Sequence, residues 1–96
     1  MVKQVIKRKG RKEAFRPEKL KRSIRGAAKD AHLSAARAKA VAGKVSHAVL
    51  KAIAKRTTVT SAVLRRKVLS HLSKVSLAAA KMWRKYDARR RARRRR

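Results

Sequence analysis

Apolar residues recur along the chain with two different spacings, and the change from one spacing to the other predicts the order of the structural elements. In the opening segment "VKQVIKRKGRKEAF", apolar and polar residues alternate on both sides of a Lys-Gly step, as in a β-hairpin whose turn uses a glycine. From Pro17 onward the apolar residues recur every three or four positions, which is the spacing of one helix face. Proline suits the first position of a helix, where its missing N–H costs nothing. The pattern therefore predicts a hairpin followed by helices.

Four stretches carry the helical spacing, and short polar segments separate them. The first runs from about 17 to 31, and the second ends near 54. A hydroxyl residue precedes each of the later three and can accept a hydrogen bond from a free N–H of the first turn. These predicted N-caps are Ser34, then Thr60 or Ser61, then Ser76. The segment "KRTTVT" before the third helix is predicted to be a loop. Gly43 lies inside the second helix, where it costs about 1 kcal/mol relative to alanine and suggests a close contact between helices.

The C-terminal segment "RRRARRRR", residues 89–96, holds seven arginines, and such a run of like charges predicts disorder. The sequence thus predicts one folded domain, residues 1–88, and a disordered basic tail, residues 89–96. A chain of 96 residues has room for a single small core. The predicted fold class is α+β, with an N-terminal β-hairpin followed by a compact bundle of about four helices.

The net charge of the chain is its dominant chemical feature. Lysine and arginine number 32 against four acidic residues, which gives a formal charge of +28, and +21 remains without the seven arginines of the tail. A compact domain with this charge repels itself unless an anionic partner neutralises it. The three aromatic residues, Phe15, Trp83 and Tyr86, fall on predicted inner faces, which argues against a platform for stacking single-stranded bases. The composition therefore favours double-stranded DNA as a partner. The sequence alone does not decide between DNA and RNA.

Several other functions are not expected from this composition. The chain has no cysteine for a disulfide or a thiolate zinc site, and its three histidines lack the i,i+4 spacing of a metal site on one helix. Four acids and no pairing of a nucleophile with a base lead us to expect a protein that is not an enzyme and requires no cofactor. The sequence also has neither a signal-peptide pattern nor an apolar run of about 18 residues, so we expect a cytoplasmic, nucleoid-associated protein.

Three segments resemble the ATP-cone domain, the regulatory nucleotide-binding module of ribonucleotide reductases and of the repressor of their genes. The opening "VIKRKGRKEAFRPEKLKRSI" is similar to the family pattern V-x-K-R-Asp/Asn-G-x-x-E-x-F-x-x-x-K. The later segments "VTSAVLRRKVLSHL" and "AAAKMWRKYD" resemble two further helices of the family and follow in the same order. The matching residues of the opening are Val5, Lys7, Arg8, Gly10, Glu13, Phe15 and Lys19.

The resemblance implies a nucleotide pocket that takes ATP or dATP. The residues it implies for this pocket are Val5, Lys7, Arg8, Glu13, Lys19 and Thr60. Their chemistry agrees with that role, because cations beside a helix N-terminus suit a triphosphate, and a carboxylate such as Glu13 can accept a hydrogen bond from a ribose hydroxyl or a base amine.

The chain departs from the family pattern in the direction of positive charge. The acid or asparagine of the family's turn is Lys9, its helix-capping Asp or Asn is Arg16, and its acid after the threonine is Val63. We interpret the chain as a small nucleoid- or chromatin-type protein that binds DNA without sequence specificity through phosphate neutralisation. The alternative is a free-standing ATP- or dATP-binding regulatory domain, and the oligomeric state is left open. The predicted DNA contacts are Lys9, Lys12, Arg16, Arg65, Arg66, Lys67, Arg84, Lys85, Arg89, Arg90, Arg91, Arg93, Arg94, Arg95 and Arg96.

Overall fold

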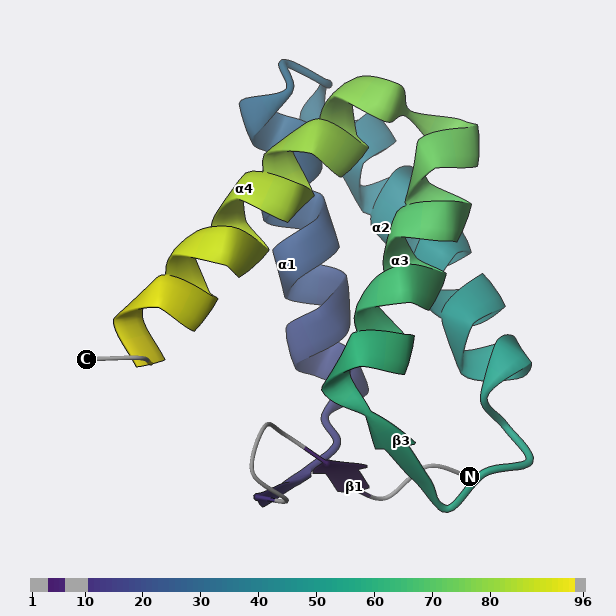
Figure 1. Ribbon diagram of the computed structural model, residues 1–96. Helices are drawn as coiled ribbons and strands as arrows, with labels where there is room; N and C mark the ends of the chain where they lie inside the picture. Colours follow the sequence, from purple (N-terminus) through teal and green to yellow (C-terminus); the bar gives the residue numbers. More distant parts are fainter. Residues whose placement is uncertain (1–3, 7–10, 95–96) are drawn as a thin grey trace.

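The computed structural model describes residues 4–6 and 11–94, with the side chains of 93 and 94 left out of the description. Three short strands form a small sheet at one end of four helices, as Figure 1 shows. The elements are β1 (Gln4–Ile6), β2 (Lys12–Ala14), α1 (Pro17–Asp30), α2 (Ala35–Ala52), β3 (Thr58–Thr60), α3 (Ser61–Val75) and α4 (Leu77–Arg94). The predicted α+β class, with a hairpin and four helices, is confirmed. The predicted Lys-Gly turn lies outside the described residues.

The sheet contains one strand that the sequence did not predict. β1 is central and pairs antiparallel with β2, with Val5 opposite Glu13, and parallel with β3, with Val5 opposite Val59. The prediction of a loop at "KRTTVT" was therefore wrong for Thr58–Thr60. Its β-branched residues suit a strand, but a parallel pair needs a long crossover connection, here through α1 and α2, which no local pattern reveals. Val59 is 2% exposed and Val5 is 6% exposed, so the pairing also closes the core at this end.

The predicted hydroxyl caps begin the helices as expected. In each case the side-chain oxygen accepts a hydrogen bond of 3.2 Å from the backbone N–H three residues later, which satisfies a donor that the first turn leaves free. Ser34 caps α2, Thr60 caps α3, and Ser76 caps α4. α1 differs, because Arg16 at its N-cap makes no side-chain cap hydrogen bond and Pro17 follows it.

The core lies between the four helices and is closed by the sheet. α1 contacts α2 and α4, and α3 contacts the same two helices, so each helix packs against two others. Within residues 4–6 and 11–94, no helix combines the length and the apolar character needed to cross a membrane. The buried apolar residues are Val5, Leu20, Ile24, Ala27, Ala28, Ala38, Val41, Ala42, Val45, Val49, Ile53, Val59, Val68, Leu72, Ala79, Ala80 and Trp83.

The arginine-rich end of the chain is helical where the structure describes it. α4 continues through Arg94, and its last turns extend away from the body of the bundle in Figure 1. The prediction of disorder from Arg89 onward is therefore corrected for 89–94, while 95 and 96 lie outside the described residues. Arginine is a strong helix former, and an i,i+4 ion pair of 3.2 Å joins Arg91 to Asp87. Cations near a helix C-terminus also interact favourably with the helix dipole.

Two glycines inside helices should be replaceable by alanine with a gain in stability. A Cβ atom built at Gly26 in α1 or at Gly43 in α2 meets no heavy atom within 4 Å, so the close packing predicted at Gly43 is not present. Each substitution to alanine should raise the free energy of unfolding by about 0.5–1 kcal/mol, because glycine loses more backbone freedom when the helix forms. Urea unfolding followed by circular dichroism measures this gain. A loss of stability in either variant would contradict the open space at that position.

Candidate functional site

A cleft of about 1300 Å³ opens where the sheet meets the first turns of α1 and α3 and the last turns of α4. β1 and β2 form one wall together with the segment that leads into α1. The start of α3, which lies beside β1 because Thr60 pairs with Ile6, and α4 complete the lining. The cleft therefore lies between segments from both ends of the chain, and its volume is above the roughly 300–1,000 Å³ that is usual for small-molecule sites.

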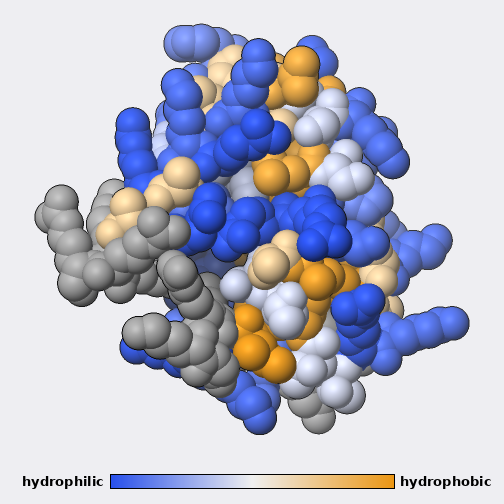
Figure 2. All heavy atoms as spheres, viewed as in Figure 1, coloured by the Kyte–Doolittle hydropathy of each residue, from blue (hydrophilic) through white to orange (hydrophobic). Residues whose placement is uncertain are grey.

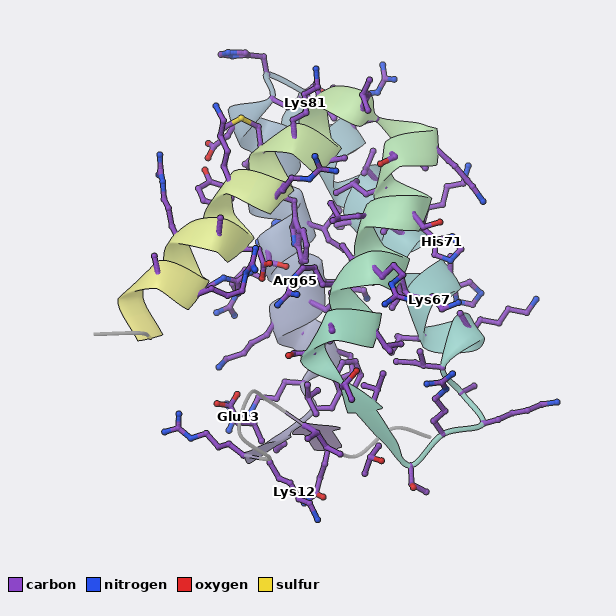
Figure 3. All side chains as sticks on the ribbon, in the orientation of Figure 1. Lys12, Glu13, Arg65, Lys67, His71 and Lys81 are labelled. Atoms are coloured by element: carbon purple, nitrogen blue, oxygen red, sulfur yellow. The ribbon has the colours of Figure 1, made fainter. Side chains whose placement is uncertain are left out.

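Four of the six predicted nucleotide-binding residues line this cleft. They are Val5, Glu13, Lys19 and Thr60, which come from β1, β2, α1 and the N-cap of α3. The other two, Lys7 and Arg8, lie outside the described residues. Neighbouring side chains on a strand point to opposite faces. Figure 3 shows Lys12 pointing away from the helices, whereas Glu13 lies on the side nearer the end of α4.

Two helix N-termini face the cleft. Thr60, Ser61 and Ala62 line it at the start of α3, while Arg16 and Lys19 line it at the start of α1. Backbone N–H groups in a first turn are free to donate, and the helix dipole favours negative charge there. The start of α3 offers more of these donors than that of α1, because Pro17 has no N–H and the N–H of Lys19 donates to the Arg16 carbonyl oxygen at 3.1 Å. An anion in the cleft would therefore meet backbone donors as well as cationic side chains.

The charges of the cleft are strongly unbalanced toward the positive. Among the described residues that line it, six are cations and only Glu13 and Asp87 are acids. The cations form two groups, one near the sheet and α1 and one on α3 and α4. The first group is Arg11, Arg16 and Lys19, and the second is Arg65, Arg90 and Arg91.

Asp87 on α4 holds two arginines of the second group. Its Oδ2 atom lies 2.5 Å from Nε of Arg65 and 3.2 Å from Nε of Arg91. The Asp87 side chain is 15% exposed and that of Arg65 is 27% exposed, so this part of the cleft is partly shielded from water. Figure 3 shows Arg65 pointing from α3 toward α4. The ion pairs thus link α3 to the last turns of α4.

Apolar side chains form the inner surface of the cleft. Phe15, Leu20 and Leu64 line it, and so does Trp83, which is 5% exposed. The Nε1–H of Trp83 donates a 3.2 Å hydrogen bond to Oγ of Ser23, which joins α4 to α1. An apolar surface beside cationic groups suits a ligand with a flat apolar part and a charged part.

The family model that describes the ATP cone domain matches residues 3–95. The chain belongs to the ATP cone domain family. This membership confirms the resemblance inferred from the opening motif and the two later segments. Among curated proteins, none matches the chain. Membership of this family indicates a nucleotide-binding regulatory module. The described residues of the opening motif, Val5, Glu13, Phe15 and Lys19, all line the cleft.

The predicted DNA contacts do not gather on one face of this ATP cone domain. Arg16, Arg65, Arg90 and Arg91 line the cleft. Arg65, Arg66 and Lys67 are consecutive on α3 and point in different directions, because successive residues of a helix differ by about 100°. Figure 3 shows Lys67 on the opposite side of α3 from Arg65. The exposed members outside the cleft are Lys12, Arg66, Arg84, Lys85 and Arg89. Lys9, Arg95 and Arg96 lie outside the described residues, and only the helical backbone is described at Arg93 and Arg94.

The sequence did not predict most of the α3–α4 side of the cleft as part of a nucleotide pocket. Trp83 was assigned to the core, which is correct, but it also faces the cleft. Arg65, Arg90 and Arg91 were assigned to DNA, and Ser23 and Asp87 were assigned no role. The sequence held one clue to these residues, the resemblance of the two later segments to helices of the family. That clue shows the order of the helices along the chain, but it does not show that α3 and α4 lie beside the opening motif.

Proposed function

We propose that this ATP cone domain is a regulatory module that binds ATP or dATP in the cleft. The observation that carries the proposal is the convergence of Val5, Glu13, Lys19 and Thr60, from four separate elements, on one cleft. Each of these residues belongs to the set that the family resemblance implied. Binding, and not catalysis, is the proposed role of the domain.

The arrangement assigns a part of the nucleotide to each group of residues. Lys19, Arg16 and the first turn of α3 supply cations and N–H donors for the phosphates. The carboxylate of Glu13 is the proposed acceptor for a ribose hydroxyl or a base amine. The apolar surface that includes Phe15 and Leu64, which are both half-buried, is the proposed contact for the flat face of the base.

The test is the stabilisation of the folded domain by ATP. At a concentration about 100 times its dissociation constant, ATP should raise the free energy of unfolding by about 2.7 kcal/mol, because a ligand of the native state stabilises it by mass action. Glu13→Ala should reduce this stabilisation, even though the variant has one more net positive charge and attracts anions more strongly. Thermal unfolding with increasing ATP measures both effects.

Matched controls separate a pocket from general attraction between opposite charges. Glu18→Ala changes the net charge by the same amount, and Glu18 is exposed in the first turn of α1 outside the cleft. Tripolyphosphate supplies the anionic charge without base and ribose. If Glu13→Ala and Glu18→Ala respond equally to ATP, and tripolyphosphate stabilises as well as ATP does, the nucleotide pocket is refuted.

Duplex DNA is the second candidate ligand, and the observation that favours it is the charge of +28 in 96 residues. Hydrophilic side chains cover most of the face in Figure 2, with smaller apolar patches between them. The sequence interpretation placed DNA first, whereas membership of the ATP cone family favours the nucleotide and lends DNA no support. DNA binding would be sequence-nonspecific and would place the protein at the nucleoid.

A further inference from the structure

Asp87 gathers two guanidinium groups that also face the proposed nucleotide cleft. Arg65 comes from α3 and Arg91 from α4, and both approach the same carboxylate oxygen, at 2.5 Å and 3.2 Å. All three side chains line the cleft. Arginine forms its strongest and most directional hydrogen bonds with carboxylates and phosphates, since its planar fork fits the geometry of both.

A phosphate group in this part of the cleft could bind the same two guanidinium groups that Asp87 binds, those of Arg65 and Arg91. Two arginines from different helices, both directed at one oxygen, make an arrangement that an oxyanion of a ligand can share or take over. The first cation group comes from other elements, the sheet end of the chain and the start of α1. The cleft therefore has a second set of cations that can bind phosphate, on α3 and α4. The Asp87 carboxylate already binds two of these cations and would compete with the phosphate for them.

We propose that Arg65 and Arg91 form a second phosphate-binding position of the cleft and that the Asp87 carboxylate competes with the ligand for it. The proposal rests on the assignment of the cleft to a nucleotide. It adds that ligand binding weakens the i,i+4 pair between Asp87 and Arg91, which supports the end of α4. Occupancy of the cleft is thereby coupled to the order of the arginine-rich segment that follows Asp87.

Isothermal titration of the full chain with tripolyphosphate tests the position directly. Arg65→Gln should weaken binding about tenfold relative to its neighbour variant Arg66→Gln, because a charge-assisted hydrogen bond is lost in one case and only net charge in the other. Arg66 is exposed and does not line the cleft. Arg91→Gln and Arg89→Gln form the same comparison on α4, where an exposed position does not disturb the core.

Removal of the competitor should have the opposite effect. Asp87→Asn should tighten tripolyphosphate binding several-fold relative to Asp30→Asn, which makes the same change of charge at an exposed residue outside the cleft. If Asp87→Asn does not fold, the NMR signals of the Arg65 and Arg91 Nε–H groups in the unaltered chain provide the readout. These signals should move on titration, and that of Arg89 should move much less.

The outcomes distinguish this inference from the proposed function. Equal affinities within each matched pair, or Nε–H signals that do not respond, would overturn the second phosphate position. If ATP binding still depended on Glu13 in that case, the proposed function would stand without it. Tripolyphosphate has neither base nor ribose, so a weakened Arg65→Gln variant supports the phosphate position whatever the Glu13 experiment gives.

Discussion

Raising the salt concentration from about 50 to 200 mM is expected to weaken duplex DNA binding by roughly 10³- to 10⁵-fold, if the protein neutralises about six to ten DNA phosphates. The physical cause is counterion release, which makes the logarithm of the affinity fall by about 0.9 per neutralised phosphate for each unit of log salt. The charge of +28 supplies more cations than such a contact requires. Fluorescence anisotropy with random and defined duplexes at several salt concentrations measures the slope.

A truncated chain that ends at Ala88 serves as the internal comparison. It lacks seven arginines and should show a smaller salt slope, because fewer phosphates are neutralised. It should still unfold cooperatively, since Trp83 is the last buried apolar residue among those described. A flat salt response of the full chain, or strong preference for one DNA sequence, would remove DNA as a candidate. An unchanged slope after truncation would place the DNA contacts on the folded body.

The parts of the fold that the sequence predicted correctly are those governed by neighbouring residues. Ser34, Thr60 and Ser76 cap helices because a hydroxyl and an N–H three residues later are close in any helix start. The hairpin pairing of β1 with β2 is likewise a local matter. These features depend on steric and hydrogen-bonding rules that act within a few residues.

The features that were missed depend on contacts between distant segments or on competing local effects. β3 pairs with β1 across more than 50 residues of chain, so "TVT" alone could not reveal a strand. At the C-terminus, repulsion between arginines competes with their helix propensity and with the Asp87–Arg91 pair, and the helix prevails through Arg94.

The same reasoning explains why only one side of the cleft was predicted as a nucleotide pocket. The opening motif lies within residues 5–19, so the spacing of its residues can be read directly from the sequence. The other side depends on how α4 packs against α1 and α3, and Ser23 and Trp83 are separated by 60 positions. Sequence order cannot show that Arg65 and Arg91 meet at Asp87.

Replacing Trp83 with alanine is expected to remove a large part of the stability of the domain. The side chain is 5% exposed and lies in the core between α4 and α1. Substitution of a buried tryptophan by alanine typically costs about 3–5 kcal/mol through lost burial and a residual cavity. Domains of this size are stable by only about 5–15 kcal/mol, so a substantial fraction of the margin would disappear. Urea unfolding should be followed by circular dichroism, because Trp83 is the sole tryptophan and the variant has no tryptophan fluorescence.

Trp83→Phe separates the packing of the ring from its hydrogen bond. Phenylalanine keeps an aromatic side chain between α4 and α1 but cannot donate to Ser23, whose own hydroxyl still donates to the Leu20 carbonyl at 2.8 Å. The loss should therefore be well below that of alanine, on the order of 1 kcal/mol for one hydrogen bond plus a smaller packing term. A loss in Trp83→Phe as large as in Trp83→Ala would mean that the hydrogen bond, and not the buried ring, holds α4 against α1. ATP should still stabilise the phenylalanine variant, because an aromatic ring still supports the lining of the cleft from the core, whereas the alanine variant leaves a cavity behind that lining.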